Sequence, residues 1–244
     1  LRRIRGTCLV LASIGSLIYV ESRRPVVPEG ASVAYSELDA FAQVPMRARI
    51  STSWFCPGVA AGDGVDSGRV VIANPTDVDI TAAVTLLSDG NPEQQVVIVP
   101  ARSRNSVDLL RGRTKGVVVP IVEVIGSHGI VEQQLEFAAG DTTSLCVTAT
   151  SSSWFFADGF TLEGSRERLI LANPFPESAV VNMSFSTADG QRRPTALQGF
   201  IMPARSVKSF DMSKEGANEE QLLAIEVRAT TGKIIASRAQ HYLG

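Results

Sequence analysis

Histidine is scarce in this sequence, and the common catalytic and nucleotide-binding motifs are missing. Among 244 residues there are 2 histidines. No Gly-x-Ser-x-Gly, His-Glu-x-x-His, P-loop or dinucleotide-binding pattern occurs. His128 falls in a predicted turn and His241 lies near the C-terminus, so neither belongs to a recognisable catalytic set. We therefore expect a protein that is not an enzyme, with no catalytic residue, no metal site and no cofactor.

Positive charge is also in short supply beyond the N-terminus. The formal net charge is −2, but five of the 23 basic residues lie within the first 24 residues. From residue 25 onward the chain has 18 basic and 24 acidic residues. A body with this balance repels the phosphates of nucleic acids. We therefore expect no nucleic-acid partner.

A single long apolar run is present, and it lies at the N-terminus between Gly6 and Val20. Its length suits a secretion signal or a short membrane span. No small-x-small cleavage site follows it, and the arginines at positions 2, 3 and 5 fit the cytoplasmic side of a membrane. We expect residues 1–24 to be an uncleaved membrane anchor, followed by a linker over 25–47, with the rest of the chain outside the cytoplasm. A cleaved signal peptide and a buried core helix are the alternatives.

The apolar run is rich in small residues. Ala12, Ser13 and Ser16 lie at helical spacings that place them on roughly one face. Small residues allow helix backbones to approach closely in a membrane. These three residues are therefore candidates for packing against a partner helix, and the alternative is a generic anchor.

The rest of the sequence is organised by an internal repeat. Five motifs recur in one order at offsets of 99 to 103 residues. They are Ser53–Phe55 with Ser153–Phe155, Arg69–Pro75 with Arg168–Pro174, Pro100–Ser103 with Pro203–Ser206, Val122–Val124 with Ile225–Val227, and Gly129 with Gly232. Self-similarity of this kind indicates two copies of one structural unit. We expect one domain over residues 48–141 and a second over 142–244.

Each unit contains short runs rich in β-branched residues and separated by turn signals. The expected strands are Arg69–Ala73, Ile80–Leu87, Gln94–Val99, Ser106–Leu110, Val117–Ile125 and Ile130–Phe137 in the first unit, and Leu169–Ala172, Val180–Ser186, Leu197–Met202, Val207–Phe210, Leu222–Ala229 and Ile234–Ala239 in the second. Asp189-Gly190 is a hairpin signal. This spacing predicts an all-β fold of two tandem homologous immunoglobulin-like β-sandwiches after the N-terminal helix.

Three cysteines are present. Cys8 lies in the apolar run, Cys56 follows the first Trp motif, and Cys146 lies eight residues before the second. An even pair in an extracytoplasmic domain favours a disulfide between Cys56 and Cys146. Two free buried thiols are the alternative.

The two tryptophans, Trp54 and Trp154, occupy equivalent places in the repeat. Because both units need the same packing, we expect both in the cores. The alternative is a pair of exposed platforms that contact a glycan or a partner. Asn74 and Asn173 each precede a proline at a strand end, and an Asn side chain there stabilises a turn. The glycine-rich loop from Asp63 to Asp66 is expected to be solvated, with cation binding as the alternative.

The motifs Trp154–Thr161 and Leu169–Pro174, together with Trp54–Pro57 and Cys146, resemble a family of single-pass actinobacterial membrane proteins of unknown function. The resemblance covers roughly residues 50–240. The first unit departs from the pattern, because Cys-Pro-Gly stands where x-x-Gly is usual and no Gly-x-Thr follows. The resemblance implies a place outside the cytoplasmic membrane and an association with cell-envelope glycan synthesis. It implies no catalytic activity.

From these features we expect a single-pass membrane protein with extracytoplasmic C-terminal domains. The expected function is a non-catalytic scaffold, an accessory subunit of a membrane complex in cell-envelope glycan synthesis. The expected partner is a polytopic membrane protein, with a glycosyltransferase as the candidate. The alternative functions are an envelope glycan-binding or adhesion module and a hydrolase with an unusual site. Exposed aromatics beside acidic side chains in a groove would favour the glycan-binding alternative.

Overall fold

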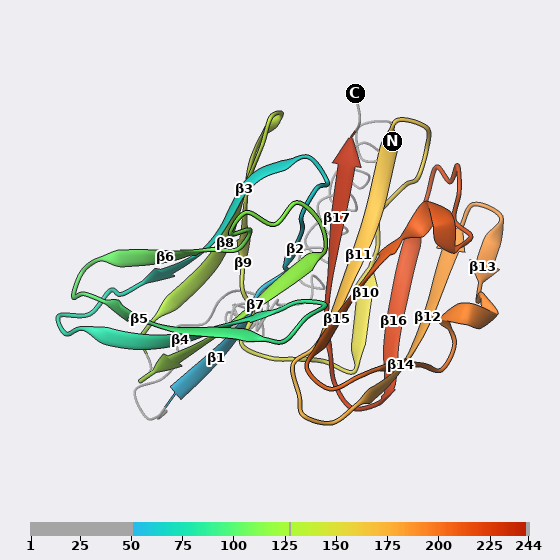
Figure 1. Cartoon of the computed structure of the whole chain (residues 1–244). Helices are drawn as coiled ribbons and strands as arrows, with labels where there is room; N and C mark the ends of the chain where they lie inside the picture. The colour runs from blue at the N-terminus through green and yellow to red at the C-terminus, as the bar shows by residue number, and fades with distance from the viewer. Residues whose placement is uncertain (1–50, 127, 243–244) are drawn as a thin grey trace, which may run out of the picture. The chain divides into compact units, whose positions relative to one another are not determined.

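A computed structural model describes residues 51–126 and 128–242. The described residues belong to one compact unit, Ala40–Gly244. The expected membrane anchor over 1–24, the linker over 25–47 and the small residues Ala12, Ser13 and Ser16 lie outside the described residues. Within the described part of the chain the fold is all-β, as expected, with short 3-10 helices and no α-helix (Figure 1).

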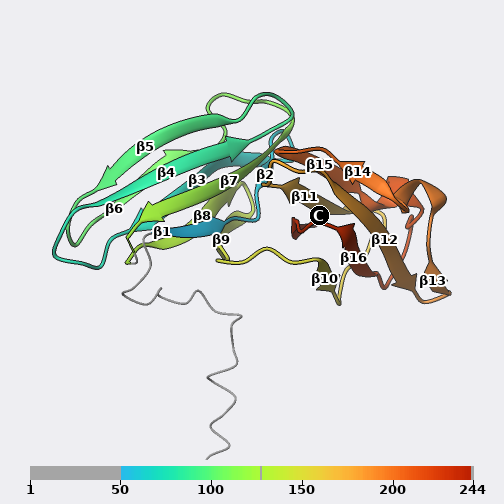
Figure 2. The ribbon, with the colours of Figure 1, turned by 90° about the horizontal axis from the view of Figure 1, so that it is seen from below.

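The first group of strands runs from β1 to β9. Its members are β1 (Ser51–Phe55), β2 (Val59–Ala60), β3 (Val65–Ala73), β4 (Ile80–Leu87), β5 (Glu93–Val99), β6 (Arg104–Asp108), β7 (Val117–Ile125), β8 (Ile130–Phe137) and β9 (Gly140–Leu145). One sheet has the order β1-β7-β4-β5, with β2 also paired to β7, and the other has the order β6-β3-β8-β9. Figures 1 and 2 show these sheets as two layers. The first group therefore has the character of a β-sandwich.

The second group runs from β10 to β17. Its members are β10 (Ser153–Phe156), β11 (Ser165–Asn173), β12 (Ala179–Thr187), β13 (Gly190–Arg192), β14 (Phe200–Met202), β15 (Ser206–Asp211), β16 (Ala224–Thr231) and β17 (Ile235–Tyr242), with 3-10 turns η2 (Thr195–Leu197) and η3 (Met212–Glu215). One sheet has the order β10-β16-β12-β13, with β14 also paired to β12, and the other has the order β15-β11-β17. Strand for strand, these orders repeat those of the first group, with β13 and β14 together in the place of β5. No described strand of the second group takes the place of β2 or β9.

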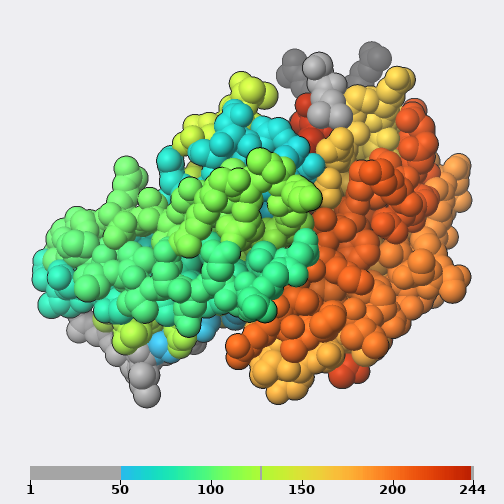
Figure 3. All heavy atoms as spheres, in the orientation of Figure 1, coloured from blue at the N-terminus to red at the C-terminus, as the bar shows by residue number. Residues whose placement is uncertain are grey.

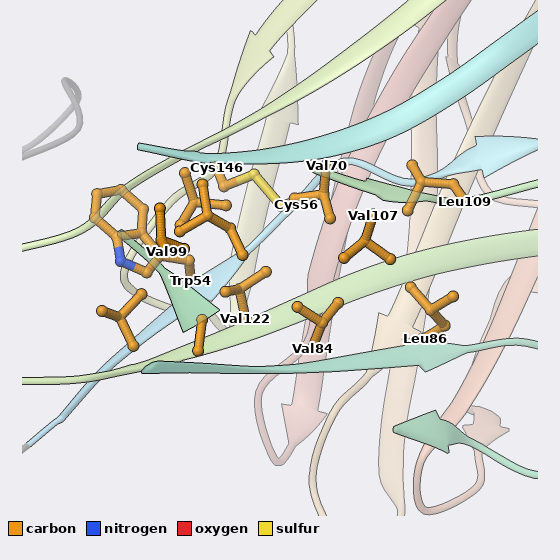
Figure 4. Close-up of a cluster of buried hydrophobic side chains, with 14 of the residues drawn as sticks. Trp54, Cys56, Val70, Val84, Leu86, Val99, Val107, Leu109, Val122 and Cys146 are labelled. Carbon is orange, nitrogen blue, oxygen red and sulfur yellow. A yellow bond between two sulfur atoms is a disulfide. The ribbon is translucent and has the colours of Figure 1, made fainter. Parts of the chain in front are cut away.

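Alternation of apolar and polar residues explains why these segments are strands. In β4 the buried residues Ile80, Ala82, Val84 and Leu86 alternate with half-buried ones, so one face covers the core. The core of the first group gathers such residues from both sheets around Trp54 (Figure 4). A separate core forms around Leu171, Met183 and Phe185 in the second group.

The strand register corrects the expected alignment of the repeat near its end. Trp54 lies opposite Val122, and Trp154 lies opposite Val227. Val122 is therefore equivalent to Val227 and not to Ile225, which shifts the offset from 103 to 105. The same offset relates Ile130, which pairs with Ala73, to Ile235, which pairs with Ala172. The sequence motif aligned two Glu-Val pairs that lie on different positions of equivalent strands.

One expected strand was too long, and β1, β2, β9, β10 and β13 were not among the expected strands. Leu197–Met202 was expected to be one strand, but only Phe200–Met202 is extended, because Thr195–Leu197 form a 3-10 turn and Gly199 takes a positive φ of 64°. β9 was missed because its sequence, Gly-Asp-Thr-Thr-Ser-Leu, shows no alternation of buried residues. It is an edge strand whose side chains are mostly exposed.

Asn74 and Asn173 hold equivalent turns in the two groups. The Asn74 side chain donates to the carbonyls of Val78, Val99 and Pro100 at 2.8 to 3.0 Å and accepts from the Thr76 amide at 3.0 Å. Asn173 repeats the arrangement. Its side chain donates to the carbonyls of Glu177, Met202 and Pro203 and accepts from the Phe175 amide. Both side chains are buried. Each therefore acts as a turn-stabilising residue that ties two connections together.

A disulfide joins Cys56 to Cys146 (Figure 4). Cys56 follows β1, the edge strand of one sheet, and Cys146 follows β9, the edge strand of the other. Backbone bonds of 2.8 and 2.9 Å between Phe55 and Val147 lie beside it. The disulfide thus fastens together the open side of the first sandwich.

The two groups pack against each other through a third apolar cluster. It contains Leu87, Val117 and Val119 from the first group and Ile170, Ala172, Val207 and Ile235 from the second, with Phe55, Ala60 and Ile121 packed at its side. Figure 3 shows the atoms of the two groups in direct contact. The β7 residues Val118, Val122 and Val124 face their own core, whereas Val117 and Val119 face the second group. This seam is apolar and shared, so it couples the two groups.

Candidate functional site

A groove of about 600 Å³ lies between the two groups of strands. Its walls come from the loop after β1, the β8–β9 hairpin and strand β17. The lining residues are Pro57, Gly58, Asp63, Gly64, Gln133, Leu135, Phe137–Thr142, Ser144, Ile170 and Ser237–Tyr242. Aromatic, aliphatic, polar and charged side chains meet here, which is the mixture that binding pockets use. The groove is therefore the candidate site.

Glutamine side chains fix the loop that forms one wall. Gln133 on β8 is buried, accepts from the Gly58 amide at 2.8 Å and donates to the Gly58 carbonyl at 2.7 Å. Across the groove, Ser237 on β17 donates to the Pro57 carbonyl at 2.5 Å. In the second group Gln240 bonds Phe160 in the same two-way manner, at 3.3 and 3.1 Å. The groove is thus bounded by backbone held in place from both sides.

Asp63 does not lie in a solvated loop as expected. Its carboxylate pairs with Arg166 at 3.1 Å and with the Nε and Nη2 atoms of Arg168. Both arginines belong to β11 of the second group. The Asp63 side chain is 12% exposed. This ion-pair cluster joins the two groups at the border of the groove.

His241 lies in the groove beside this cluster. Its ring meets the edge of Phe137 with a centroid separation of 5.9 Å. Burial lowers the pKa of His241, and Arg166 and Arg168 act in the same direction, whereas Asp63 opposes them. His241 is therefore held neutral near pH 7 and offers the groove an uncharged ring.

Glu167 is a buried carboxyl group behind the groove. It is fully buried on β11, and neither of its oxygens has a hydrogen-bond partner among the described residues. Burial raises the pKa of Glu167 to about 7. Arg238, with Nη1 3.9 Å from Glu167 Oε1, acts in the opposite direction, and so does the Phe160 backbone amide, which lies near the carboxyl group without completing a hydrogen bond. A Cβ atom at Gly159 would overlap this carboxyl group. Because Gly159 closes over it, Glu167 has no exposed surface on which a substrate could react.

The tryptophans differ in their surroundings. Trp54 is fully buried in the first core, and its Nε1 has no hydrogen-bond partner among the described residues. Trp154 is only partly buried against the second core, and its Nε1 donates to the Ile234 carbonyl at 3.2 Å. Neither tryptophan lines the groove. The aromatic residues in the groove are Phe137, His241 and Tyr242, none of which the sequence singled out as a contact residue.

The described residues contain neither a cluster of metal-binding side chains nor a membrane-spanning helix. No group of three or more His, Cys, Asp or Glu side chains there could hold a metal ion. No helix in residues 51–126 and 128–242 is long and apolar enough to span a membrane.

Comparison with known proteins adds a family of unknown function. The model of a family of unknown function (DUF5719) matches residues 128–241. This similarity is consistent with the expected resemblance to an uncharacterised family. No curated protein matches the sequence.

Two solved structures show distant likeness. The crystal structure of Thermotoga maritima 1070 is 15% identical with a TM-score of 0.35, over 40% of this chain and 94% of that chain. The crystal structure of Streptomyces avermitilis alpha-L-rhamnosidase complexed with L-rhamnose is 12% identical with a TM-score of 0.28, over 80% of this chain and 25% of that chain. This chain therefore spans about a quarter of the rhamnosidase. At these values neither likeness bears on function.

Proposed function

We propose that this chain is a non-catalytic, membrane-anchored scaffold outside the cytoplasm, and that its inter-sandwich groove binds a partner. The single observation that carries the proposal is the groove itself, which is lined by residues of both groups. The shared apolar seam and the Asp63 cluster keep its walls in one arrangement. A site between coupled sandwiches suits a scaffold that holds a partner in place.

Two tandem homologous immunoglobulin-like sandwiches form the body of this scaffold. The similar strand orders of the two groups and their equivalent Asn-centred turns support that description. The resemblance to actinobacterial single-pass membrane proteins supports the N-terminal anchor and a place in envelope glycan synthesis. The partner of this accessory subunit is a polytopic membrane protein, with a glycosyltransferase as the candidate.

A second candidate function is glycan binding in the same groove. Phe137 and Tyr242 line it together with Asp141, and Tyr242 is 74% exposed. An exposed aromatic ring next to a carboxylate can stack on and hydrogen-bond a sugar. This is the arrangement expected for an envelope glycan-binding or adhesion module.

The groove is tested with a matched pair of substitutions on β9. Thr142 is exposed and lines the groove, whereas its neighbour Thr143 is exposed and does not. Successive side chains of a strand point to opposite faces, so Thr142→Arg obstructs the groove and Thr143→Arg does not. Membranes holding the full chain are dissolved in mild detergent and the chain is recovered by an affinity tag.

The wild type and Thr143→Arg should co-purify with the same polytopic membrane protein, and Thr142→Arg should lose it. Circular dichroism and thermal melting verify that both variants fold. Equal recovery of the partner by both variants would show that the groove is not its binding site. A partner absent from all three samples would contradict the scaffold proposal.

A further inference from the structure

The groove runs along the edge of a strand. Six consecutive residues of β17, from Ser237 to Tyr242, line it. Alternate side chains of a strand point to opposite faces of the sheet, so a space beside one face meets every second residue. A space that meets every residue in turn lies beside the edge, where the backbone N–H and C=O groups are presented.

The first group shows what occupies the equivalent edge. With the offset of 105, Ser237–Tyr242 of β17 correspond to Glu132–Phe137 of β8. Those β8 residues are the ones paired with β9, from Glu132 opposite Leu145 to Phe137 opposite Gly140. The groove therefore follows the length of β17 whose counterpart in the first group carries an added strand.

No described strand covers this edge of β17. Its sheet has the order β15-β11-β17, whereas the equivalent sheet is β6-β3-β8-β9. An open edge presents a row of backbone donors and acceptors that bind a further strand. The β8–β9 hairpin and β17 bound a groove of about 600 Å³ at this place, so the edge faces an open groove and not a flat surface.

We propose that the edge of β17 over Ser237–Tyr242 binds an extended polypeptide segment of the partner as an antiparallel strand. This inference rests on the proposed function of the groove and names the class of its occupant. Main-chain hydrogen bonds to β17 hold the segment, as in other cases of strand addition. One set of its alternate side chains meets the aliphatic lining at Leu135 and Ile170, so an aliphatic residue is required there.

The test supplies the missing strand within the chain. Leu243-Gly244 is replaced by Ala-Ala-Gly-Asp-Thr-Thr-Ser-Leu, which copies Ala138–Leu145 after Tyr242, the equivalent of Phe137. A short tether gives the graft an effective concentration of about millimolar. The control graft has Pro in place of its first Thr, the copy of Thr142. The Cys146 amide donates to the Val131 carbonyl, so the alternating ladder also points the Thr142 N–H at β8. Proline at this position therefore removes an N–H from the ladder. Hydrogen exchange over residues 237–242 and recovery of the partner are measured for both chains.

The graft should slow exchange over residues 237–242 by about tenfold or more, and the Pro graft should not. It should also displace the membrane partner that the Pro graft retains. Unchanged exchange in the grafted chain would overturn the proposal. A docked graft that leaves the partner bound would overturn it too, because the strand site would then be separate from the partner site.

Two comparisons separate this inference from the proposed function. If Thr142→Arg removes the partner but the graft does not dock, the groove function stands and strand addition is wrong. An N-acetylglucosamine trimer is also titrated into the ungrafted chain and followed by NMR. Shifts at Phe137 and Tyr242 without docking of the graft would assign the groove to a glycan and overturn the strand.

Discussion

At the scale of residues, Glu167 is a buried ionisable side chain that the fold itself does not require. The equivalent position in the first group is Gly68, where a Cβ atom would lie 3.0 Å from the Leu135 side chain. The same place is thus filled by aliphatic side chains in one sandwich and by a carboxyl group in the other. A buried carboxylate that no hydrogen bond fully satisfies is costly, and its protonation removes part of that cost.

Glu167 should make the protein less stable as the pH rises. Its folded pKa of about 7 lies above the usual value of 4.5. The folded state therefore binds the proton more tightly, so the stabilisation is complete below pH 4.5 and is lost as the pH rises through 7. A shift of this size corresponds to about 3 kcal/mol. Arg238 from β17 and Asp158 from the loop after β10 are the charges that act on it.

Glu167→Gln tests this dependence, because glutamine resembles the protonated acid. Urea unfolding of the wild type and the variant is compared between pH 4.5 and pH 8. The variant should gain up to about 3 kcal/mol over the wild type as the pH rises across this window. Glu163→Gln, at an exposed carboxylate in the preceding loop, is the matched control and should leave the dependence unchanged. Parallel curves for wild type and Glu167→Gln would contradict the assignment.

The sequence contained part of the signal for Glu167. Leu169 and Leu171 alternate with it along the chain, which places the three on one face of a strand. The expected strand began at Leu169, so Glu167 and its flanking arginines, Arg166 and Arg168, lay outside it. Only the pairing of both arginines with Asp63, 103 residues away in the case of Arg166, shows that this end is covered. Contacts over such distances are not encoded in local periodicity.

At the scale of elements, strands with a clear apolar face were predicted with their bounds. Ile80–Leu87, Val117–Ile125 and Ile130–Phe137 match β4, β7 and β8. β9 was missed because an exposed edge strand needs no apolar face. The groove could not be predicted either, because it is defined by β9, β17 and the way the two groups pack.

The disulfide joins the ends of edge strands β1 and β9 and should add substantially to the stability of the fold. It joins residues 90 positions apart, which corresponds to about 4–5 kcal/mol in the chain-entropy description. Protein isolated from its native cells should therefore contain an oxidised pair. Non-reducing mass spectrometry with alkylation checks this, and two alkylated thiols would contradict it.

The contribution of the disulfide to the stability of the protein is tested with Cys56→Ala together with Cys146→Ala. The double variant should unfold at lower denaturant, with the loss assigned to the first group of strands. Hydrogen exchange should rise at β1 and β9, which the disulfide fastens, before it rises in β12 and β16. Cys8→Ala is the control, because Cys8 takes no part in this pair. An unchanged midpoint for the double variant would show that the Phe55–Val147 backbone bonds suffice.

At the scale of the whole molecule, the recurring phenylalanine lies at the seam between the two groups in the first group only. Phe55 and Phe155 occupy equivalent positions next to the tryptophans of β1 and β10. Phe55 packs against the shared seam, whereas Phe155 is 68% exposed. Both tryptophans of the recurring motif pack against their own core, although Trp54 is buried more fully than Trp154. The two phenylalanines have different surroundings.

This asymmetry provides a matched pair for measuring the coupling. Phe55→Ser removes a partly buried ring from the seam and should cost about 2 kcal/mol, less than the full cost of emptying a buried Phe site. Phe155→Ser removes an exposed ring and should change stability by less than about 0.5 kcal/mol.

In calorimetry the wild type should unfold in one transition, because apolar contacts across the seam are lost together with the cores. Phe55→Ser should separate the unfolding of the two groups into two steps, and the groove between them should then lose its fixed walls. One unaltered transition in Phe55→Ser would mean that the Asp63 ion pairs with Arg166 and Arg168 couple the groups without the apolar seam.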